Sequence, residues 1–129
     1  MRLLLDTHIF LWFVEGSSKL ADAHREAIQN PANDAYLSVV SAWEATIKFQ
    51  LGKLPLPEPP LSYFPSRRAS HRIVSLELTE AAVQRLTGLP PIHRDPFDRM
   101  LVCQALEHGL TLVTDDPKIG FYAAPVLSP

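Results

Sequence analysis

The chain opens on the stretch Met1-Arg2-Leu3-Leu4-Leu5-Asp6-Thr7-His8, in which an apolar run ends at a carboxylate. A short continuous apolar run is typical of a strand that is covered on both faces of a parallel sheet. An acid directly after such a strand lies in a costly environment unless it has a partner. As the N-cap of a helix that begins at Thr7, Asp6 would gain only about 1 kcal/mol. The stretch therefore predicts a buried strand and a carboxylate with a further role.

The closing part of the chain repeats this arrangement in Leu112-Val113-Thr114-Asp115-Asp116-Pro117, where an apolar run again ends at acids. Ser41-Ala42-Trp43-Glu44 and Asp95-Pro96-Phe97-Asp98 have the composition of helix starts with an acid in the first turn. Helices that alternate with parallel strands begin at the carboxyl edge of the sheet, where ligands usually bind. We therefore expect four carboxylates to meet at that edge: Asp6, Glu44, Asp98 and Asp116.

The order of the predicted elements indicates an α/β fold in which helices cover both faces of a parallel sheet of four to five short strands. The strands are expected at 3–5, 35–39, 72–75 and 111–113, with one edge strand in the tail through Pro125. The helices are expected at 9–14, 20–30, 41–51, 61–70, 79–87 and 97–108. The length of 129 residues fits a single domain over residues 1–129.

Composition narrows the class of protein. The apolar content of 47% is typical of a soluble globular domain, and no apolar run reaches the roughly 18 residues that span a bilayer. Asp6 and His8 interrupt the first apolar run, so we expect neither a signal peptide nor a membrane anchor. Cys103 is the only cysteine and lies in an apolar stretch, which predicts a buried side chain, no internal disulfide and a cytoplasmic location.

Charge points to a metal site. The net charge of −2 argues against broad electrostatic wrapping of nucleic acid, but it is compatible with a nuclease whose metal ions meet the phosphate. Four converging carboxylates repel one another unless a cation neutralises them. Oxygen ligands favour Mg²⁺ or Mn²⁺, and the five histidines show no close pair at the spacing of a zinc site. The leading hypothesis is therefore metal-assisted cleavage of a phosphodiester bond.

Each acid also has a purely structural explanation. Ser41 and Glu44 fit a capping box, in which the glutamate bonds back to the backbone of the cap. Asp95-Pro96 and Asp116-Pro117 fit an N-cap followed by proline at the first helical position. Asp98, in the first turn of the helix expected at 97–108, would then merely complement the helix dipole. The residues alone leave two choices of ligand open: Asp95 or Asp98, and Asp115 or Asp116.

Other polar residues near the predicted site have plainer explanations. His93 lies close to Asp95 in the sequence, but a position in a surface loop is the favoured interpretation. The one basic cluster is expected to be a solvated helix face, and a rim that guides phosphate is the alternative. The cluster consists of Arg67, Arg68, His71 and Arg72.

Motifs of other enzyme classes are absent. The chain has no Gly-x-Ser-x-Gly nucleophile elbow and no Gly-x-x-x-x-Gly-Lys-Ser/Thr loop for nucleoside triphosphates. An aspartyl phosphatase would place a second acid two residues after Asp6, where His8 stands instead.

Four blocks of the sequence resemble those of PIN-domain proteins. They are Leu-Leu-Leu-Asp-Thr-His, Ser-Val-Val-Ser-Ala-Trp-Glu-Ala-Thr-Ile-Lys, His-Arg-Asp-Pro-Phe-Asp-Arg-Met-Leu and Leu-Val-Thr-Asp-Asp, in this order along the chain. The chain is most similar to the VapC-like toxins of bacterial and archaeal type II toxin–antitoxin systems. This resemblance implies a three-layer α/β/α fold and a metal-dependent endoribonuclease that cleaves RNA, forms a homodimer and is inhibited by a small cognate antitoxin.

The resemblance also assigns roles to residues. It implies that Mg²⁺ or Mn²⁺ is bound by the acidic quartet Asp6, Glu44, Asp98 and Asp116, and that Thr114 supplies the family's hydroxyl group. Asp98 is preferred to Asp95 because the residues that follow it match the family's helix pattern. Asp116 is preferred to Asp115 because the family spacing is Thr-x-Asp.

Apolar side chains near the predicted site are candidates for an antitoxin groove, a dimer contact or the core: Phe10, Trp12, Phe13 and Trp43. An antitoxin is expected to lay an apolar helix or strand across this surface and to place a basic side chain among the acids. Two other functions use the same metal site without an antitoxin, namely a structure-specific DNA nuclease and an RNA-processing nuclease.

Overall fold

The computed structural model describes residues 1–129 and has a central sheet of five strands in the order β3-β2-β1-β4-β5. Every neighbouring pair of strands is parallel, which confirms the predicted sheet. The strands are β1 (Arg2–Leu5), β2 (Asp34–Ser38), β3 (Val74–Leu76), β4 (Thr111–Val113) and β5 (Val126–Leu127). The first strand of the sequence therefore lies at the centre of the sheet, where both of its neighbours are hydrogen-bonded to it.

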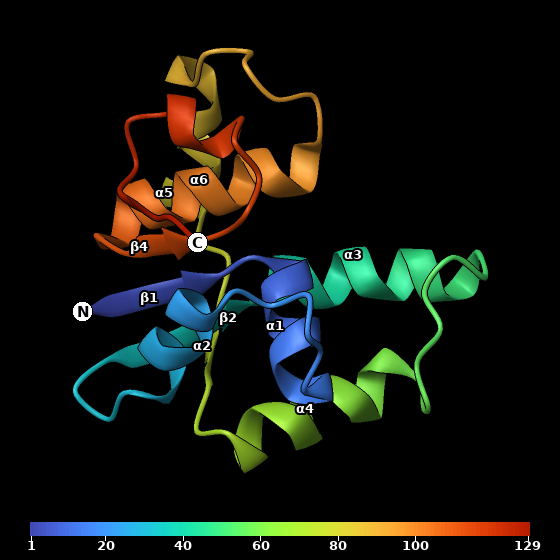
Figure 1. Cartoon of the computed structure of the whole chain (residues 1–129). Coiled ribbons are helices and arrows are strands. Elements are labelled where there is room, and N and C mark those ends of the chain that lie inside the picture. The colour runs from blue at the N-terminus through green and yellow to red at the C-terminus, as the bar shows by residue number, and fades with distance from the viewer.

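Helices cover the sheet on both faces, as the α/β/α prediction requires (Figure 1). α5 and α6 lie on one face, and α1, α2 and α4 lie on the other, while α3 leaves the carboxyl end of β2. The helices are α1 (Thr7–Glu15), α2 (Asp22–Gln29), α3 (Val39–Gln50), α4 (Pro60–Ser70), α5 (Glu80–Gln84) and α6 (Pro96–His108), with short 3₁₀ turns at Arg85–Gly88 and Ile119–Phe121. None of these helices combines the length and the apolar character that crossing a bilayer requires.

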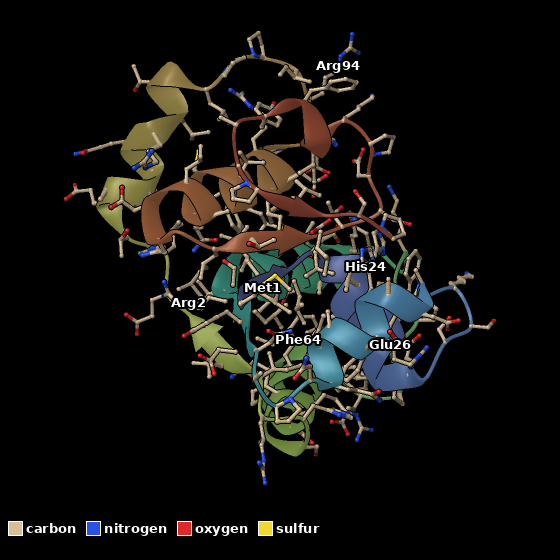
Figure 2. The ribbon with its side chains drawn as sticks, turned by 60° about the vertical axis from the view of Figure 1, so that its left-hand side comes forward. Met1, Arg2, His24, Glu26, Phe64 and Arg94 are labelled. Atoms are coloured by element: carbon tan, nitrogen blue, oxygen red, sulfur yellow. The ribbon has the colours of Figure 1, made fainter.

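The alternation of side chains along β1 divides the core into two parts. Leu3 and Leu5 pack with Phe10 and Phe64 on the face covered by α1, α2 and α4. Leu4 points to the opposite face and packs against α6 and β4. All five side chains are fully or almost fully buried, and Figure 2 labels Phe64 among the side chains of its layer. A strand that is buried on both faces explains why the opening run is apolar at every position.

Several boundaries differ from the predicted ones, most clearly those around α3 and β3. β2 ends at Ser38 because its hydroxyl accepts a hydrogen bond from the backbone N–H of Val40 and so caps α3. The predicted capping box is therefore wrong: Ser41 is already inside the helix, and Glu44 lies in its second turn. β3 begins at Val74 because the chain turns after α4 ends at Ser70, with Arg72 in the left-handed region at φ 56°.

The helix predicted at 79–87 divides into α5 and a 3₁₀ turn, although Thr79 caps it as expected by accepting a hydrogen bond from the N–H of Ala82. The segment after Asp116 is also shorter than an N-cap pattern predicts. Asp116 Oδ1 accepts a hydrogen bond from the N–H of Lys118, and only a 3₁₀ turn follows. The side chain thus closes a local turn instead of starting an α-helix.

Candidate metal centre

Asp6 lies at the carboxyl end of the central strand, and its carboxylate bridges two elements. Oδ1 accepts a hydrogen bond of 2.9 Å from the N–H of His8 and so caps α1. Oδ2 accepts a bond of 2.7 Å from the hydroxyl of Thr114, which follows the neighbouring strand β4. The side chain is buried, and burial raises the pKa of Asp6 even though both hydrogen bonds lower it.

Glu44 approaches the same region from α3, and partners occupy both of its carboxylate oxygens. Oε1 accepts a bond of 2.8 Å from the hydroxyl of Thr7, which itself lies 2.9 Å from the hydroxyl of Ser41. Oε2 forms an ion pair of 2.6 Å with Lys48, one helical turn farther along. Because Glu44 is almost fully buried, these partners compensate a charge that would otherwise be costly.

Asp98 lies in the first turn of α6, and no lysine or arginine forms an ion pair with its carboxylate. Burial, together with the nearby acids Asp95, Asp6 and Glu44, raises the pKa of Asp98 to about 7. The Nε2 atom of His93 lies 3.3 Å from the Oδ2 atom of Asp98. Without a cation, burial and the neighbouring acids therefore favour the protonated form of this carboxyl group near neutral pH.

Asp95 has a different role from that of Asp98. Its Oδ1 atom accepts hydrogen bonds from the backbone N–H groups of Phe97 and Asp98, so it is the N-cap of α6 that the sequence predicts. The two acids of this doublet thus have different partners: Asp95 accepts hydrogen bonds from the helix backbone, whereas Asp98 lies beside His93.

Both carboxylate oxygens of Asp116 have hydrogen-bond partners. Oδ2 lies 2.7 Å from Nε2 of His93, and Oδ1 accepts the N–H of Lys118. Burial by itself would raise the pKa of Asp116, but these two hydrogen bonds outweigh it and hold the pKa below its usual value. Asp115 is exposed, and Thr114 accepts a hydrogen bond from the N–H of Asp116. Thr114 therefore contacts both Asp6 and Asp116.

A pocket of about 310 Å³ lies among these side chains and has no hydrophobic lining residue. The structure thus brings all four predicted acids to one pocket, together with both alternative acids. The acidic lining residues are Asp6, Glu44, Asp95, Asp98, Asp115 and Asp116. We call this cavity the acidic pocket.

The donor atoms of the acidic pocket fit a hard divalent cation. Ligand atoms of His93, Asp98 and Asp116 lie within 4.8 Å of one another. Carboxylate oxygens are the ligands that Mg²⁺ and Mn²⁺ prefer. Lys48 is the only lysine or arginine in the lining and is already paired with Glu44, so no other lysine or arginine of the pocket balances the charge of the remaining acids.

Sequence reasoning missed two polar contacts of the site. The surface-loop interpretation of His93 is wrong, because its side chain is only 12% exposed and lies against Asp116. No periodicity marks a loop residue, so only its nearness to Asp95 in the sequence was a signal. The ion pair between Glu44 and Lys48 has the i, i+4 spacing of helical charge pairs, and that signal was visible in the sequence.

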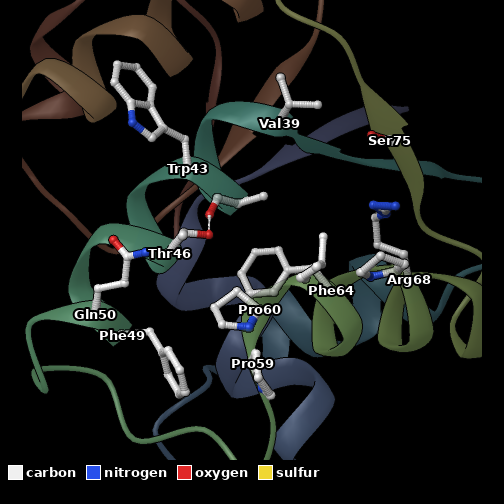
Figure 3. A pocket seen from close by; sticks show the side chains of 13 residues that line it. Val39, Trp43, Thr46, Phe49, Gln50, Pro59, Pro60, Phe64, Arg68 and Ser75 are labelled. Carbon is white, nitrogen blue, oxygen red and sulfur yellow. Dashed lines mark hydrogen bonds between the residues drawn. The ribbon is translucent and has the colours of Figure 1, made fainter.

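A second, apolar pocket of about 620 Å³ lies between α3 and α4 (Figure 3). We call it the α3–α4 groove. Trp43 lines it and is 58% exposed, with its ring edge-on to Phe97 at a centroid distance of 5.0 Å. Phe10 and Phe13 are buried in the core, which settles the alternatives for those two residues, whereas Trp12 is half-buried at the core's margin.

The basic cluster does not reach the acidic pocket. Arg68 lines the α3–α4 groove, Arg72 lines a separate polar pocket, and Arg67 lies over the ring of Tyr63 at 5.0 Å. None of the three arginines is a lining residue of the acidic pocket. The alternative of a phosphate-guiding rim therefore gains no support from this geometry.

Comparison with known proteins places these features in a family. The PIN domain family model matches residues 3–126. Ribonuclease VapC22 of Mycobacterium tuberculosis is 26% identical over 123 residues, which are 95% of this chain and 92% of that protein. Ribonuclease VapC16 of the same organism is 41% identical over 68 residues, but this match spans only 51% of this chain and 48% of that protein.

Solved structures share the fold. A DNA-bound VapBC from Salmonella typhimurium matches with a TM-score of 0.68 at 17% identity and covers 99% of this chain and 98% of the solved one. VapBC2 from Rickettsia felis, bound to a promoter DNA fragment, matches with a TM-score of 0.67 at 15% identity and the same coverage. The chain belongs to the PIN domain family, and within that family it is VapC-like.

Proposed function

We propose that this chain is a divalent-metal-dependent endoribonuclease and the toxin of a type II toxin–antitoxin pair. The observation that carries the proposal is the convergence of acids from four separate segments on one pocket with no hydrophobic lining. Membership in the PIN domain family and similarity to proteins named ribonuclease VapC support RNA as the substrate.

In this proposal Asp6, Asp98 and Asp116 hold Mg²⁺ or Mn²⁺. A divalent cation supplies Lewis-acid activation of water and charge compensation at a phosphate. Glu44 acts through water, since Thr7 and Lys48 already engage its two oxygens. Thr114 keeps the carboxylate of Asp6 in position by hydrogen bonding to Oδ2.

Two local observations favour one acid of each doublet. Asp95 uses Oδ1 to cap α6, which favours Asp98 as the ligand. Asp115 is exposed, whereas Asp116 lies beside His93 and Asp98, which favours Asp116. These preferences agree with those implied by the sequence resemblance.

The proposed partners are a cognate antitoxin and a second copy of the chain, in the cytoplasm. Similarity to solved VapBC and toxin–antitoxin complexes supports an antitoxin. The α3–α4 groove, with Trp43 exposed beside it, is the apolar surface on which an antitoxin segment would dock. A short reading frame that encodes a DNA-binding protein next to this gene would support the toxin role.

Cleavage of matched oligonucleotides tests the proposed activity. The purified chain is incubated with end-labelled structured and single-stranded RNA in Mg²⁺, Mn²⁺ or EDTA. We expect internal cleavage of RNA that stops in EDTA. Asp98→Asn should lower the rate at least about 100-fold, because it removes one charged ligand from the metal site.

A matched control removes one exposed acid elsewhere, as in Glu58→Gln, which should cleave at the wild-type rate. Cleavage of DNA of the same sequence but not of RNA would favour the structure-specific DNA nuclease. RNA cleavage that the neighbouring gene product does not inhibit would favour an RNA-processing nuclease. Unchanged hydrolysis by Asp98→Asn would contradict the assignment of that ligand.

A further inference from the structure

The imidazole ring of His93 is fixed by hydrogen bonds at both nitrogens. Nδ1 accepts a bond of 3.0 Å from the backbone N–H of Asp95. A nitrogen that accepts a hydrogen bond carries no proton, so the proton of the neutral ring is on Nε2. Nε2 lies 2.7 Å from Oδ2 of Asp116 and 3.3 Å from Oδ2 of Asp98. The ring therefore presents an N–H donor, not a lone pair, to these two carboxylates.

The backbone around His93 keeps the ring in this orientation. The N–H of His93 donates to the hydroxyl of Tyr122 at 2.8 Å, and Tyr122 is buried. Two residues farther on, Asp95 caps α6 and is anchored to the helix. The loop that carries the ring is thus tied at both ends to packed parts of the molecule.

We propose that His93 is a positioning residue that donates its Nε2–H to Asp116, that it is not a metal ligand, and that it thereby makes the site favour Mg²⁺ and Mn²⁺ over Zn²⁺. This inference rests on the proposed metal site. To bind a cation through Nε2, the ring would have to move its proton to Nδ1. That proton would then face the N–H of Asp95, so two donors would oppose each other across 3.0 Å.

The hydrogen bond from His93 also determines the orientation of the Asp116 carboxylate. One oxygen accepts from His93 and the other from the N–H of Lys118, so the plane of the group is fixed before any cation arrives. Partners of this kind orient the ligands of a metal, and their loss typically weakens metal affinity about 10–100-fold.

The competing interpretation treats His93, Asp98 and Asp116 as a three-ligand site, since their ligand atoms lie within 4.8 Å of one another. An imidazole ligand suits zinc and other transition metals, whereas carboxylates alone suit magnesium and manganese. The two interpretations therefore predict opposite consequences of removing the ring.

Isothermal titration of the metal-free chain with Mg²⁺, Mn²⁺ and Zn²⁺ distinguishes them without any RNA. We expect His93→Ala to weaken Mg²⁺ and Mn²⁺ binding about 10–100-fold, and His93→Gln, which keeps a donor, to stay within about 3-fold of wild type. In a chain that already carries Asp116→Asn, the His93→Ala change should reduce the affinity for Mg²⁺ and Mn²⁺ much less. A loss of Zn²⁺ affinity that exceeds the loss of Mg²⁺ affinity in both His93 variants would overturn the proposal.

Nitrogen-15 NMR of the wild-type imidazole provides a test that requires no variant to fold. We expect the Nε2–H tautomer of His93 in the metal-free and the Mg²⁺-loaded protein, and a proton on Nδ1 in the loaded protein would overturn the proposal. The results of these tests distinguish a failure of the His93 proposal from a failure of the proposed function. Metal binding as expected without RNA cleavage contradicts the nuclease, whereas Mg²⁺-dependent cleavage with unaltered Mg²⁺ binding by His93→Ala contradicts the role of His93.

Discussion

The acidic pocket and the α3–α4 groove share the helix α3 but differ in volume and in the polarity of their lining residues. Trp43 and Glu44 are neighbours in the sequence, yet Trp43 lines the groove while Glu44 lines the acidic pocket. The acidic pocket, of about 310 Å³, has no hydrophobic lining residue, and the groove, of about 620 Å³, is mainly apolar. A single helix thus presents two surfaces that call for different ligands.

Each surface has an unfavourable contribution to the free energy of the folded chain, and a different kind of ligand removes it in each case. In the acidic pocket, the free-energy cost is the repulsion and desolvation of carboxylates, seen in the raised pKa of Asp98, and a bound divalent cation offsets it. In the groove the cost is exposed apolar area around Trp43, which an apolar partner segment covers. If the two surfaces are independent, perturbing one leaves the behaviour of the other unchanged.

The largest expected effect is stabilisation by metal. A divalent cation that binds only the folded chain raises the free energy of unfolding by about 2.7 kcal/mol at 100 times its Kd. We expect this increase in urea or thermal unfolding with Mn²⁺ or Mg²⁺, reversal by EDTA, and none of it in Asp98→Asn. Equal stabilisation of Asp98→Asn would show that the cation binds somewhere other than the acidic pocket.

The next effect is a pH dependence of the metal-free protein. The pKa of Asp98 is about 7 when folded and near 3.8 when unfolded, so the folded chain binds more protons between these values. The contribution of this group to stability is therefore fully present below about pH 4 and is lost as the pH rises through 7. On the order of 2 kcal/mol is expected, after allowing for the partial exposure of the side chain.

Asp98→Asn removes this titration and the charge that causes it. In metal-free buffer at pH 8 the variant should therefore melt at a higher temperature than wild type, and the difference should shrink towards pH 5. The exposed-acid variant Glu58→Gln should follow the wild-type curve. A wild-type advantage at pH 8 would contradict a crowded acidic cluster.

The smallest effect is expected for Trp43→Gln, which alters only the groove. The side chain is 58% exposed and packs edge-on against the ring of Phe97, so the free energy of unfolding should fall by no more than about 1 kcal/mol. RNA cleavage and metal binding should stay within about 3-fold of wild type. A loss of cleavage as large as that of Asp98→Asn would mean that groove and pocket form one substrate site.

Local sequence patterns were sufficient to predict the parallel sheet and the edge of the sheet at which the acids lie. The apolar run of β1 followed by Asp6, and that of β4 followed by Thr114, predicted buried parallel strands that end at one edge. Asp95 as a helix cap was visible for the same reason, because caps depend on residues close in sequence. The start of α3 was misplaced, since Ser38 and Ser41 are both plausible caps and only packing chooses between them.

The sequence by itself therefore determined the layered α/β architecture and the edge at which its carboxylates gather, because both follow from periodicity and from the order of strands and helices. Only the tertiary structure decided that His93 contacts Asp116 and that Thr7 and Lys48 bind the two carboxylate oxygens of Glu44. The same holds for the apolar groove between α3 and α4. The contacts of His93 with Asp116 and of Thr7 with Glu44, like the groove, join segments far apart in the sequence, so they depend on how the packed elements meet. The i, i+4 pair of Lys48 with Glu44 was visible as a spacing, but its place beside the pocket was not.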